Sequence, residues 1–127
     1  MALLLKMANI HFATMPIIVG IGLLLKPDYI SKLIFRDAPI SHQTGANTEL
    51  VDILRAGFAS RDIYMGLMLW SALWTGDRRA IGRSLLIALV VVVIDGWALQ
   101  SAMGKGLWDH WGFIPVVLVV GGKQAFF

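Results

Sequence analysis

The sequence contains no cysteine and few charged residues. Of its 127 residues, 15% are Asp, Glu, Lys or Arg, whereas soluble domains usually carry about 25%. Without cysteine the chain cannot form disulfides, use a thiol nucleophile or build a thiolate metal site. The shortage of charge argues against a soluble domain, because a small globule has a large surface that must stay wet. The length suits one domain, which we expect to cover residues 1–127.

Apolar residues dominate the chain instead. They make up 57% of it, and the mean hydropathy is +0.73. The net charge of +3 comes from basic residues that stand singly at the ends of apolar runs, where membrane helices keep them. This distribution favours membrane lipid over nucleic acid as a partner. We therefore expect an integral membrane protein that binds no nucleic acid.

The apolar runs predict four transmembrane helices, at about Met7–Leu25, Leu50–Trp74, Ala80–Ala102 and Trp108–Gly122. At ~1.5 Å per residue, the first run spans roughly 30 Å of hydrocarbon. Pro27 ends this helix, and apolar residues at helical spacing over 28–35 suit a short helix at the membrane interface. Connecting segments are expected at three places: 39–48, 75–79 and 104–106. The predicted fold class is an all-α membrane protein, a four-transmembrane-helix bundle.

Small and amide residues within these runs indicate where helices approach one another. Gly20 and Gly22 in the first run and Gly66 in the second allow close backbone contact, and Asn9 is expected to be a polar residue of helix packing. For orientation we expect cytosolic termini, because the cluster Arg78, Arg79 and Arg83 would lie on their side with Lys6 and Lys123. Other basic residues stand on the opposite side: Lys26, Lys32, Arg36 and Lys105.

The second predicted span contains four charged residues: Asp52, Arg55, Arg61 and Asp62. An ionised side chain in the middle of a membrane costs roughly 2.5–3.5 kcal/mol even on the most lenient scale. Asp52, Arg55 and Asp62 share one helix face with Ala59, and Arg61 borders that face. These charges therefore need partners inside the bundle.

The third span supplies a partner in Asp95. If spans two and three form an antiparallel hairpin about Asp77, Arg61 and Asp95 differ by roughly 3 Å in depth. The sequence therefore predicts a buried layer formed by Asp62, Arg61 and Asp95. A structural interpretation stands beside the functional one, because Asp–Arg pairs can simply fix the register between membrane helices.

Further candidates lie on either side of this layer. Trp108 and His110 are expected at the mouth of the bundle, although both also suit a membrane interface, where tryptophans form an aromatic belt. We assign substrate binding to five residues: Arg55, Tyr64, Trp97, Trp108 and His110.

Two carboxylates flanking an arginine suit acid–base chemistry on an oxygen electrophile. One ionised carboxylate deprotonates water or a hydroxyl, and the other, kept neutral by apolar surroundings, protonates the departing oxygen. Epoxide opening needs this pair and no cofactor. The sequence offers no His-rich ligand set for a metal, no Ser–His nucleophile, no phosphate-cradling loop and no dinucleotide fingerprint.

Several short motifs resemble a family of small four-helix membrane proteins of bacteria and fungi, long catalogued without a function. The motifs are 61–66 (RDIYMG), 76–82 (GDRRAIG), Asp95-Gly96 and Trp108–His110, with the region of Pro27 and Phe35. Fungal proteins of similar size and membrane character, in polyene-polyketide pathways, are regarded as epoxide hydrolases or cyclases. The resemblance implies such a role here. The soluble limonene-epoxide-hydrolase type also uses an Asp–Arg–Asp arrangement, an analogy of chemistry and not of fold.

The leading hypothesis is a membrane-embedded epoxide hydrolase or epoxide-opening cyclase of secondary metabolism, acting on a lipophilic, polyketide-type product. Arg61 would orient, and Asp62 and Asp95 would divide the base and acid roles. In a fungus it would lie in the endoplasmic reticulum or another internal membrane. One alternative is a small proton-coupled transporter working as a homodimer, with a proton carried by Asp62 or Asp95. Another is a non-catalytic membrane scaffold.

Overall fold

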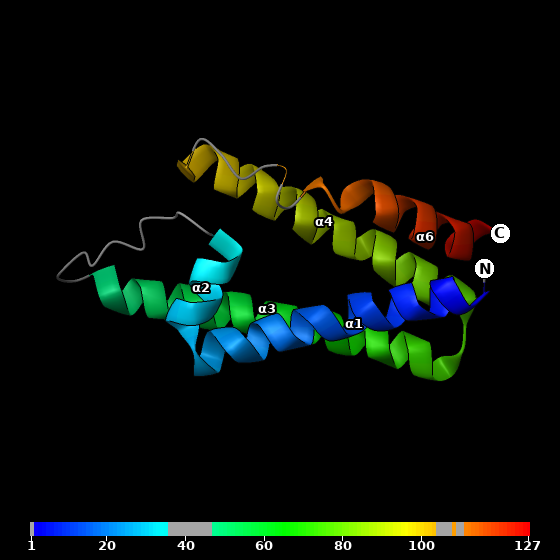
Figure 1. Ribbon diagram of the computed structural model, residues 1–127, viewed down its shortest axis with the longest axis horizontal. Coiled ribbons are helices and arrows are strands. Elements are labelled where there is room, and N and C mark those ends of the chain that lie inside the picture. Colours follow the sequence, from blue (N-terminus) through cyan, green and yellow to red (C-terminus); the bar gives the residue numbers. More distant parts are fainter. Residues whose placement is uncertain (1, 36–46, 104–107, 109–110) are drawn as a thin grey trace.

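The computed structural model describes residues 2–35, 47–103, 108 and 111–127, and these residues are almost entirely helical (Figure 1). They form five helices: α1 Ala2–Leu25, α2 Pro27–Phe35, α3 Asn47–Thr75, α4 Arg78–Met103 and α6 Ile114–Phe126. No strand occurs in this part of the chain. The all-α class is therefore confirmed.

Helix ends follow local chemistry. Pro27 opens α2 directly after the break at Lys26, as the sequence indicates. Gly76 has a φ of +69°, and the Oδ1 of Asp77 accepts a hydrogen bond from the backbone N–H of Arg79 at 2.8 Å. Because this carboxylate caps the first turn, α4 begins at Arg78, two residues earlier than predicted.

Other predicted bounds need correction. The first helix begins at Ala2, so Lys6 lies inside it. The second begins at Asn47 and therefore includes Thr48, whereas residues 39–46 of the predicted loop and the turn at 104–106 lie outside the described residues. The last helix begins at Ile114 and not at Trp108, because Pro115 in its first turn lacks an N–H and favours a helix start.

Among the described residues, two helices are long and apolar enough to cross a membrane, within Leu3–Leu25 and Arg78–Ser101. The apolar windows of these two helices are only 22% and 28% buried, whereas the core helix of a soluble protein is mostly buried. By contrast, α6 has 13 residues, or about 20 Å, which is less than the roughly 30 Å of a hydrocarbon core. The structure thus supports two spans, and the predicted four-span bundle is not confirmed.

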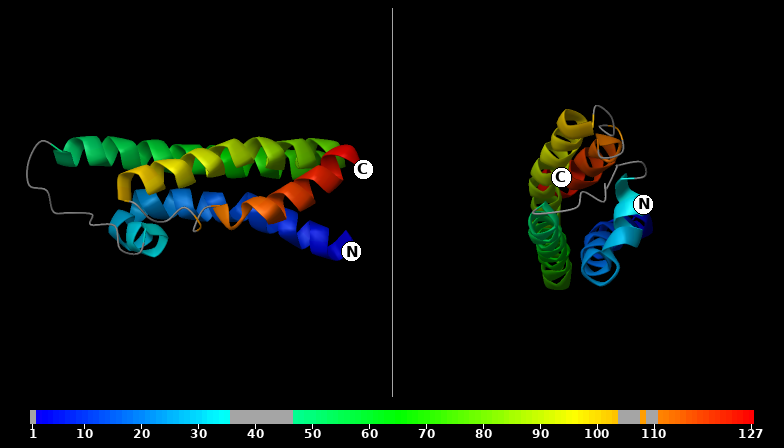
Figure 2. Two further views of the ribbon diagram at one scale, coloured as in Figure 1. Left: turned by 90° about the horizontal axis from the view of Figure 1, so that it is seen from above. Right: turned by 90° about the vertical axis from the view of Figure 1, so that its left-hand side faces the viewer.

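The helices form two antiparallel pairs, α1 with α3 and α4 with α6 (Figure 1). Both pairs meet at the end of the molecule that holds the two termini and the α3–α4 turn, and they diverge toward the other end (Figures 1 and 2). The core lies where they meet, and its main side chains are Leu69, Ala72, Ile81, Leu85, Leu89 and Val117. The sequence predicts that α3 and α4 form an antiparallel hairpin. In the structure, α3 packs more extensively on α1 and α4 on α6.

Glycine residues allow the two helices of each pair to approach closely. A Cβ placed on Gly66 of α3 would lie 2.7 Å from the carbonyl oxygen of Ala13 in α1. A Cβ on Gly82 of α4 would lie 2.6 Å from the carbonyl oxygen of Gly121 in α6. These approaches confirm the predicted contact at Gly66, and they show that small residues set the helix spacing within each pair.

Candidate functional site

Arg61 lies near the middle of α3 and joins two carboxylates that come from different helices. Its Nη1 donates to Oδ1 of Asp95 in α4 at 2.6 Å. Its Nε and Nη2 both donate to Oδ1 of the neighbouring Asp62, at 3.1 and 2.9 Å. The predicted contact between Arg61 and Asp95 is therefore confirmed, and it connects the α1–α3 pair to the α4–α6 pair.

The three side chains are largely withdrawn from the surface. The exposed fractions are 32% for Arg61, 14% for Asp62 and 17% for Asp95. One turn before this layer, Ala59 is fully buried and its carbonyl oxygen lies against Gly20 of α1. The α3 face predicted from residue spacing is thus turned into the molecule here. We call Asp62, Arg61 and Asp95 the Asp–Arg–Asp layer.

The aromatic ring of Phe58, which is not among the predicted site residues, also contacts Arg61. The Cζ atom of Arg61 lies over the ring of Phe58, 4.8 Å from the centroid. This distance is within the range of a cation–π interaction. The signal was present, because residues three apart on a helix are neighbours and Phe58 precedes Arg61 by three positions.

Arg55 lies outside the layer, in a second ion-pair group nearer the start of α3. Its Nη1 lies 3.4 Å from Oδ1 of Asp52, and its Nη2 lies 3.7 Å from Oδ1 of Asp28. Both carboxylates are highly exposed, with fractions of 73% and 82%. This group connects α3 to the first turn of α2. Exposed pairs of this length contribute little to stability.

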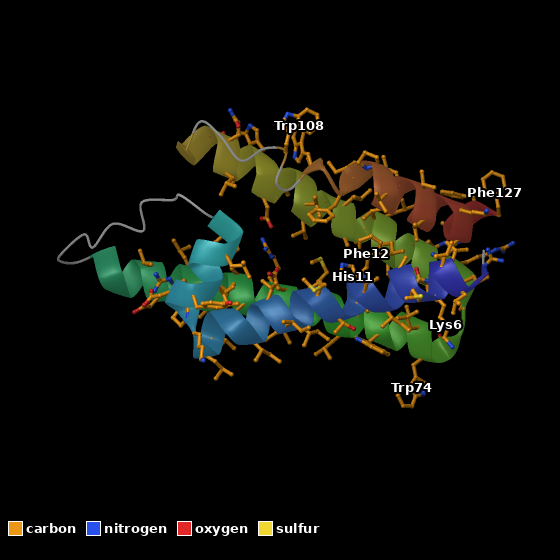
Figure 3. The ribbon with its side chains drawn as sticks, in the orientation of Figure 1. Lys6, His11, Phe12, Trp74, Trp108 and Phe127 are labelled. Atoms are coloured by element: carbon orange, nitrogen blue, oxygen red, sulfur yellow. The ribbon has the colours of Figure 1, made fainter. Side chains whose placement is uncertain are left out.

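Three of the aromatic candidates lie on the outer surface of the chain. Tyr64, Trp97 and Trp108 are 66%, 65% and 77% exposed. Figure 3 shows Trp108 near the outer surface, beside the α4–α6 pair, and Trp74 projecting from the opposite pair. His110 lies outside the described residues. Substrate binding by these five candidates, including Arg55, stays a prediction.

Two buried amide side chains form a second polar contact between the two helix pairs. Asn9 Nδ2 donates to Gln124 Oε1 at 2.8 Å, and Gln124 Nε2 donates to Asn9 Oδ1 at 2.9 Å. The expected helix-packing role of Asn9 is confirmed. Gln124 was missed, although an amide in an otherwise apolar run is itself a sign of a helix partner.

A family described as Domain of unknown function (DUF4267) matches residues 13–123. The chain belongs to that family. The matched region contains the whole Asp–Arg–Asp layer, together with Phe58 and Arg55. No curated protein and no solved structure matches the chain.

Within the described parts of the chain, no three His, Cys, Asp or Glu side chains gather as ligands for a metal. The Asp–Arg–Asp layer itself offers groups for acid–base chemistry. A guanidinium that holds one carboxylate by two N–H groups and another by one can keep a base and an acid at a fixed separation.

Proposed function

We propose that this chain is a membrane-embedded epoxide hydrolase or epoxide-opening cyclase acting on a lipophilic substrate. The observation that supports the proposal most is Arg61 bonded to Asp62 and Asp95 in one half-buried layer between two helix pairs. Such a layer supplies a base, an acid and an orienting cation, which are the three groups that epoxide opening needs.

We assign the base to Asp62 and the acid to Asp95, because the two carboxylates are held differently. Asp62 accepts two N–H groups of Arg61 and Asp95 accepts one. Charge-assisted hydrogen bonds favour an ionised acceptor, so the carboxylate with two of them is the one that stays ionised and can accept a proton from water. With one proton on Asp95 the layer is neutral, which suits an apolar environment.

The reaction then balances within the layer. Asp62 takes a proton from water while the water oxygen bonds to an epoxide carbon, and the bond between that carbon and the epoxide oxygen breaks. Asp95 gives its proton to the departing oxygen. The product is a vicinal diol, and a proton passed from Asp62 to Asp95 restores the resting state. In a cyclase, a hydroxyl of the substrate replaces water and the product is a cyclic ether.

A membrane location accounts for the lipophilic substrate in this proposal. The apolar α1 and α4 expose most of their surface, and a hydrophobic epoxide would reach the layer from the bilayer without crossing water. We keep four passes through the membrane, with α3 and the segment ending in α6 as the other two. In a fungal cell an internal membrane such as the endoplasmic reticulum would hold both enzyme and substrate.

The experiment is hydrolysis of a long-chain polyene epoxide by the purified protein in lipid nanodiscs, in water enriched in oxygen-18. We expect a diol with one heavy oxygen, or an unlabelled cyclic ether, by mass spectrometry. Arg61→Lys keeps the charge but loses the planar fork, so kcat should fall about 100-fold or more. Arg79→Lys, at the exposed start of α4, is the matched control and should keep full activity.

The scaffold alternative predicts a different result in the same experiment. If the layer only fixes helix register, neither the unaltered protein nor Asp95→Asn consumes epoxide. The substitution then only lowers the stability of the protein. Transport of an unchanged ligand into liposomes along a proton gradient would instead favour the transporter.

A further inference from the structure

We propose that Phe58 is a positioning residue that holds the guanidinium of Arg61 in the plane required by both carboxylates. The inference rests on the proposed function for its kinetic consequence, but its structural part can be tested without any substrate. No role for Phe58 follows from the charges or from the family match.

Arg61 has to satisfy two acceptors that lie on different helices. Three of its five N–H groups donate to Asp62 and Asp95, and all of them lie in the guanidinium plane. Rotation of this plane about the last side-chain bonds would move Nη1 away from Asp95 while Nε could still reach Asp62. The contact with Asp62 therefore does not by itself fix the orientation toward α4.

Phe58 supplies the missing restraint. Its ring lies under Cζ at 4.8 Å and is attached to the same helix, one turn before Arg61. A ring beneath the guanidinium restricts tilting, and its π face attracts the cation most strongly where water is excluded. Phe58 is half-exposed, so part of its ring lies outside the packed core.

The exposure of Phe58 makes the test clean, because a smaller apolar side chain here opens no buried cavity. We expect Phe58→Leu to lower kcat of epoxide opening about tenfold with KM changed less than twofold, since Leu removes the π face and keeps an apolar surface. Phe58→Trp and Phe58→Tyr keep an aromatic face and should restore kcat. Phe113→Leu, the same change at another half-exposed phenylalanine, is the matched control and should leave kcat unchanged.

A second readout does not depend on turnover. In nitrogen-15 spectra of the protein in nanodiscs, the side-chain Nε–H of Arg61 is assigned as the signal lost in Arg61→Lys. We expect a ring-current shift of this signal that disappears in Phe58→Leu, persists in Phe58→Tyr and is unaffected by Phe113→Leu. An Arg61 signal that is the same in Phe58→Leu as in the unaltered protein would overturn the proposal.

The two readouts separate the two proposals. A ring-current effect without any epoxide turnover supports the contact between Phe58 and Arg61 and counts against the hydrolase. Epoxide turnover that is equal in Phe58→Leu and the unaltered protein retains the hydrolase and overturns a positioning role for Phe58.

Discussion

At the scale of single residues, both arginines of α3 lie close to carboxylates. Arg61 is bonded to Asp62 and Asp95, and the second arginine of α3, Arg55, lies within 4 Å of Asp52 and Asp28. The two groups differ in burial. The carboxylates around Arg55 are exposed, whereas those around Arg61 are withdrawn, where electrostatic interactions are stronger and reorganise less.

The unequal bonding of the two carboxylates predicts unequal chemical rescue. In Asp62→Asn no base is present to activate water, but azide is already an anion, so it can open the epoxide directly. Its negative charge also takes the place of the lost carboxylate beside Arg61, so Asp95 can still supply the proton. We expect azide to restore turnover of Asp62→Asn, with an azido alcohol as product by mass spectrometry. In Asp95→Asn the departing oxygen still lacks its proton, so azide should give no comparable recovery. Equal rescue of both variants would contradict the assigned roles.

At the scale of helices, the close pairs depend on glycines whose backbones meet another backbone. Gly82 faces backbone atoms of Gly121 and Ala125, which cannot move without shifting α6. Gly57 of α3 is also helical, yet a Cβ placed there meets nothing within 4 Å. The same substitution should therefore have opposite effects at these two positions.

We expect Gly82→Ala to lower the free energy of unfolding by about 1–3 kcal/mol, because the added methyl group forces α4 away from α6. Gly57→Ala should be neutral or stabilising by up to about 1 kcal/mol, since alanine is the better helix former and the space is open. Unfolding of each variant by increasing SDS in mixed micelles, followed by circular dichroism, measures both values. A Gly82→Ala protein as stable as the unaltered one would show that α4 and α6 do not pack this closely.

Sequence patterns predict where the helices lie better than they predict which helices pack together. The contact between Arg61 and Asp95 could be predicted, because a tight turn and a constant rise per residue set the depth of each side chain. That α3 packs mainly on α1 could not, since hydrophobic patterns do not say which apolar faces meet. The continuous apolar pattern from Trp108 does not show that the last helix begins only at Ile114, beside Pro115. Charge pairing alone does not predict that the ring of Phe58 contacts Arg61.

At the scale of the whole molecule, an amide pair and an ion pair join the two helix pairs at two different places. The Asn9–Gln124 amide pair joins α1 to α6 where the pairs meet, beside the shared apolar core. Arg61 lies near the middle of α3 and Asp95 lies past the middle of α4, so their ion pair joins these helices away from the α3–α4 turn. The proposed base and acid therefore belong to different pairs, and their separation depends on how the pairs are held.

The amide pair can be tested by a double-mutant cycle. Asn9→Leu and Gln124→Met each replace one amide by an apolar side chain of similar size and leave the other amide buried without its partner. Each should destabilise the protein by about 1–3 kcal/mol, and the double variant should lose less than the sum, with a coupling of roughly 0.6–1.7 kcal/mol. SDS-induced unfolding measures all three variants. Strictly additive losses would mean that the two amides do not form the reciprocal pair.

The arrangement of the helices also predicts how the chain lies in a membrane. The two termini and the α3–α4 turn lie at the same end of the molecule, and Lys26 marks the other end of α1 (Figures 1 and 2). If α3 and the segment ending in α6 cross the bilayer as well as α1 and α4, these two ends face opposite sides. The basic residues at the end with the termini are Lys6, Arg78, Arg79, Arg83 and Lys123, which favours the cytosolic side for that end.

Because the chain has no cysteine, single cysteines can report this topology without background. Phe127→Cys and Arg78→Cys should react with a membrane-impermeant maleimide from the cytosolic side of sealed vesicles, and Lys26→Cys only from the opposite side. Detergent should make all three reactive, which controls for local burial. Labelling of Arg78→Cys and Lys26→Cys from the same side would mean that α3 does not cross the bilayer. The Asp–Arg–Asp layer would then lie at the membrane surface, and a substrate entering from the lipid could not reach it by the proposed route.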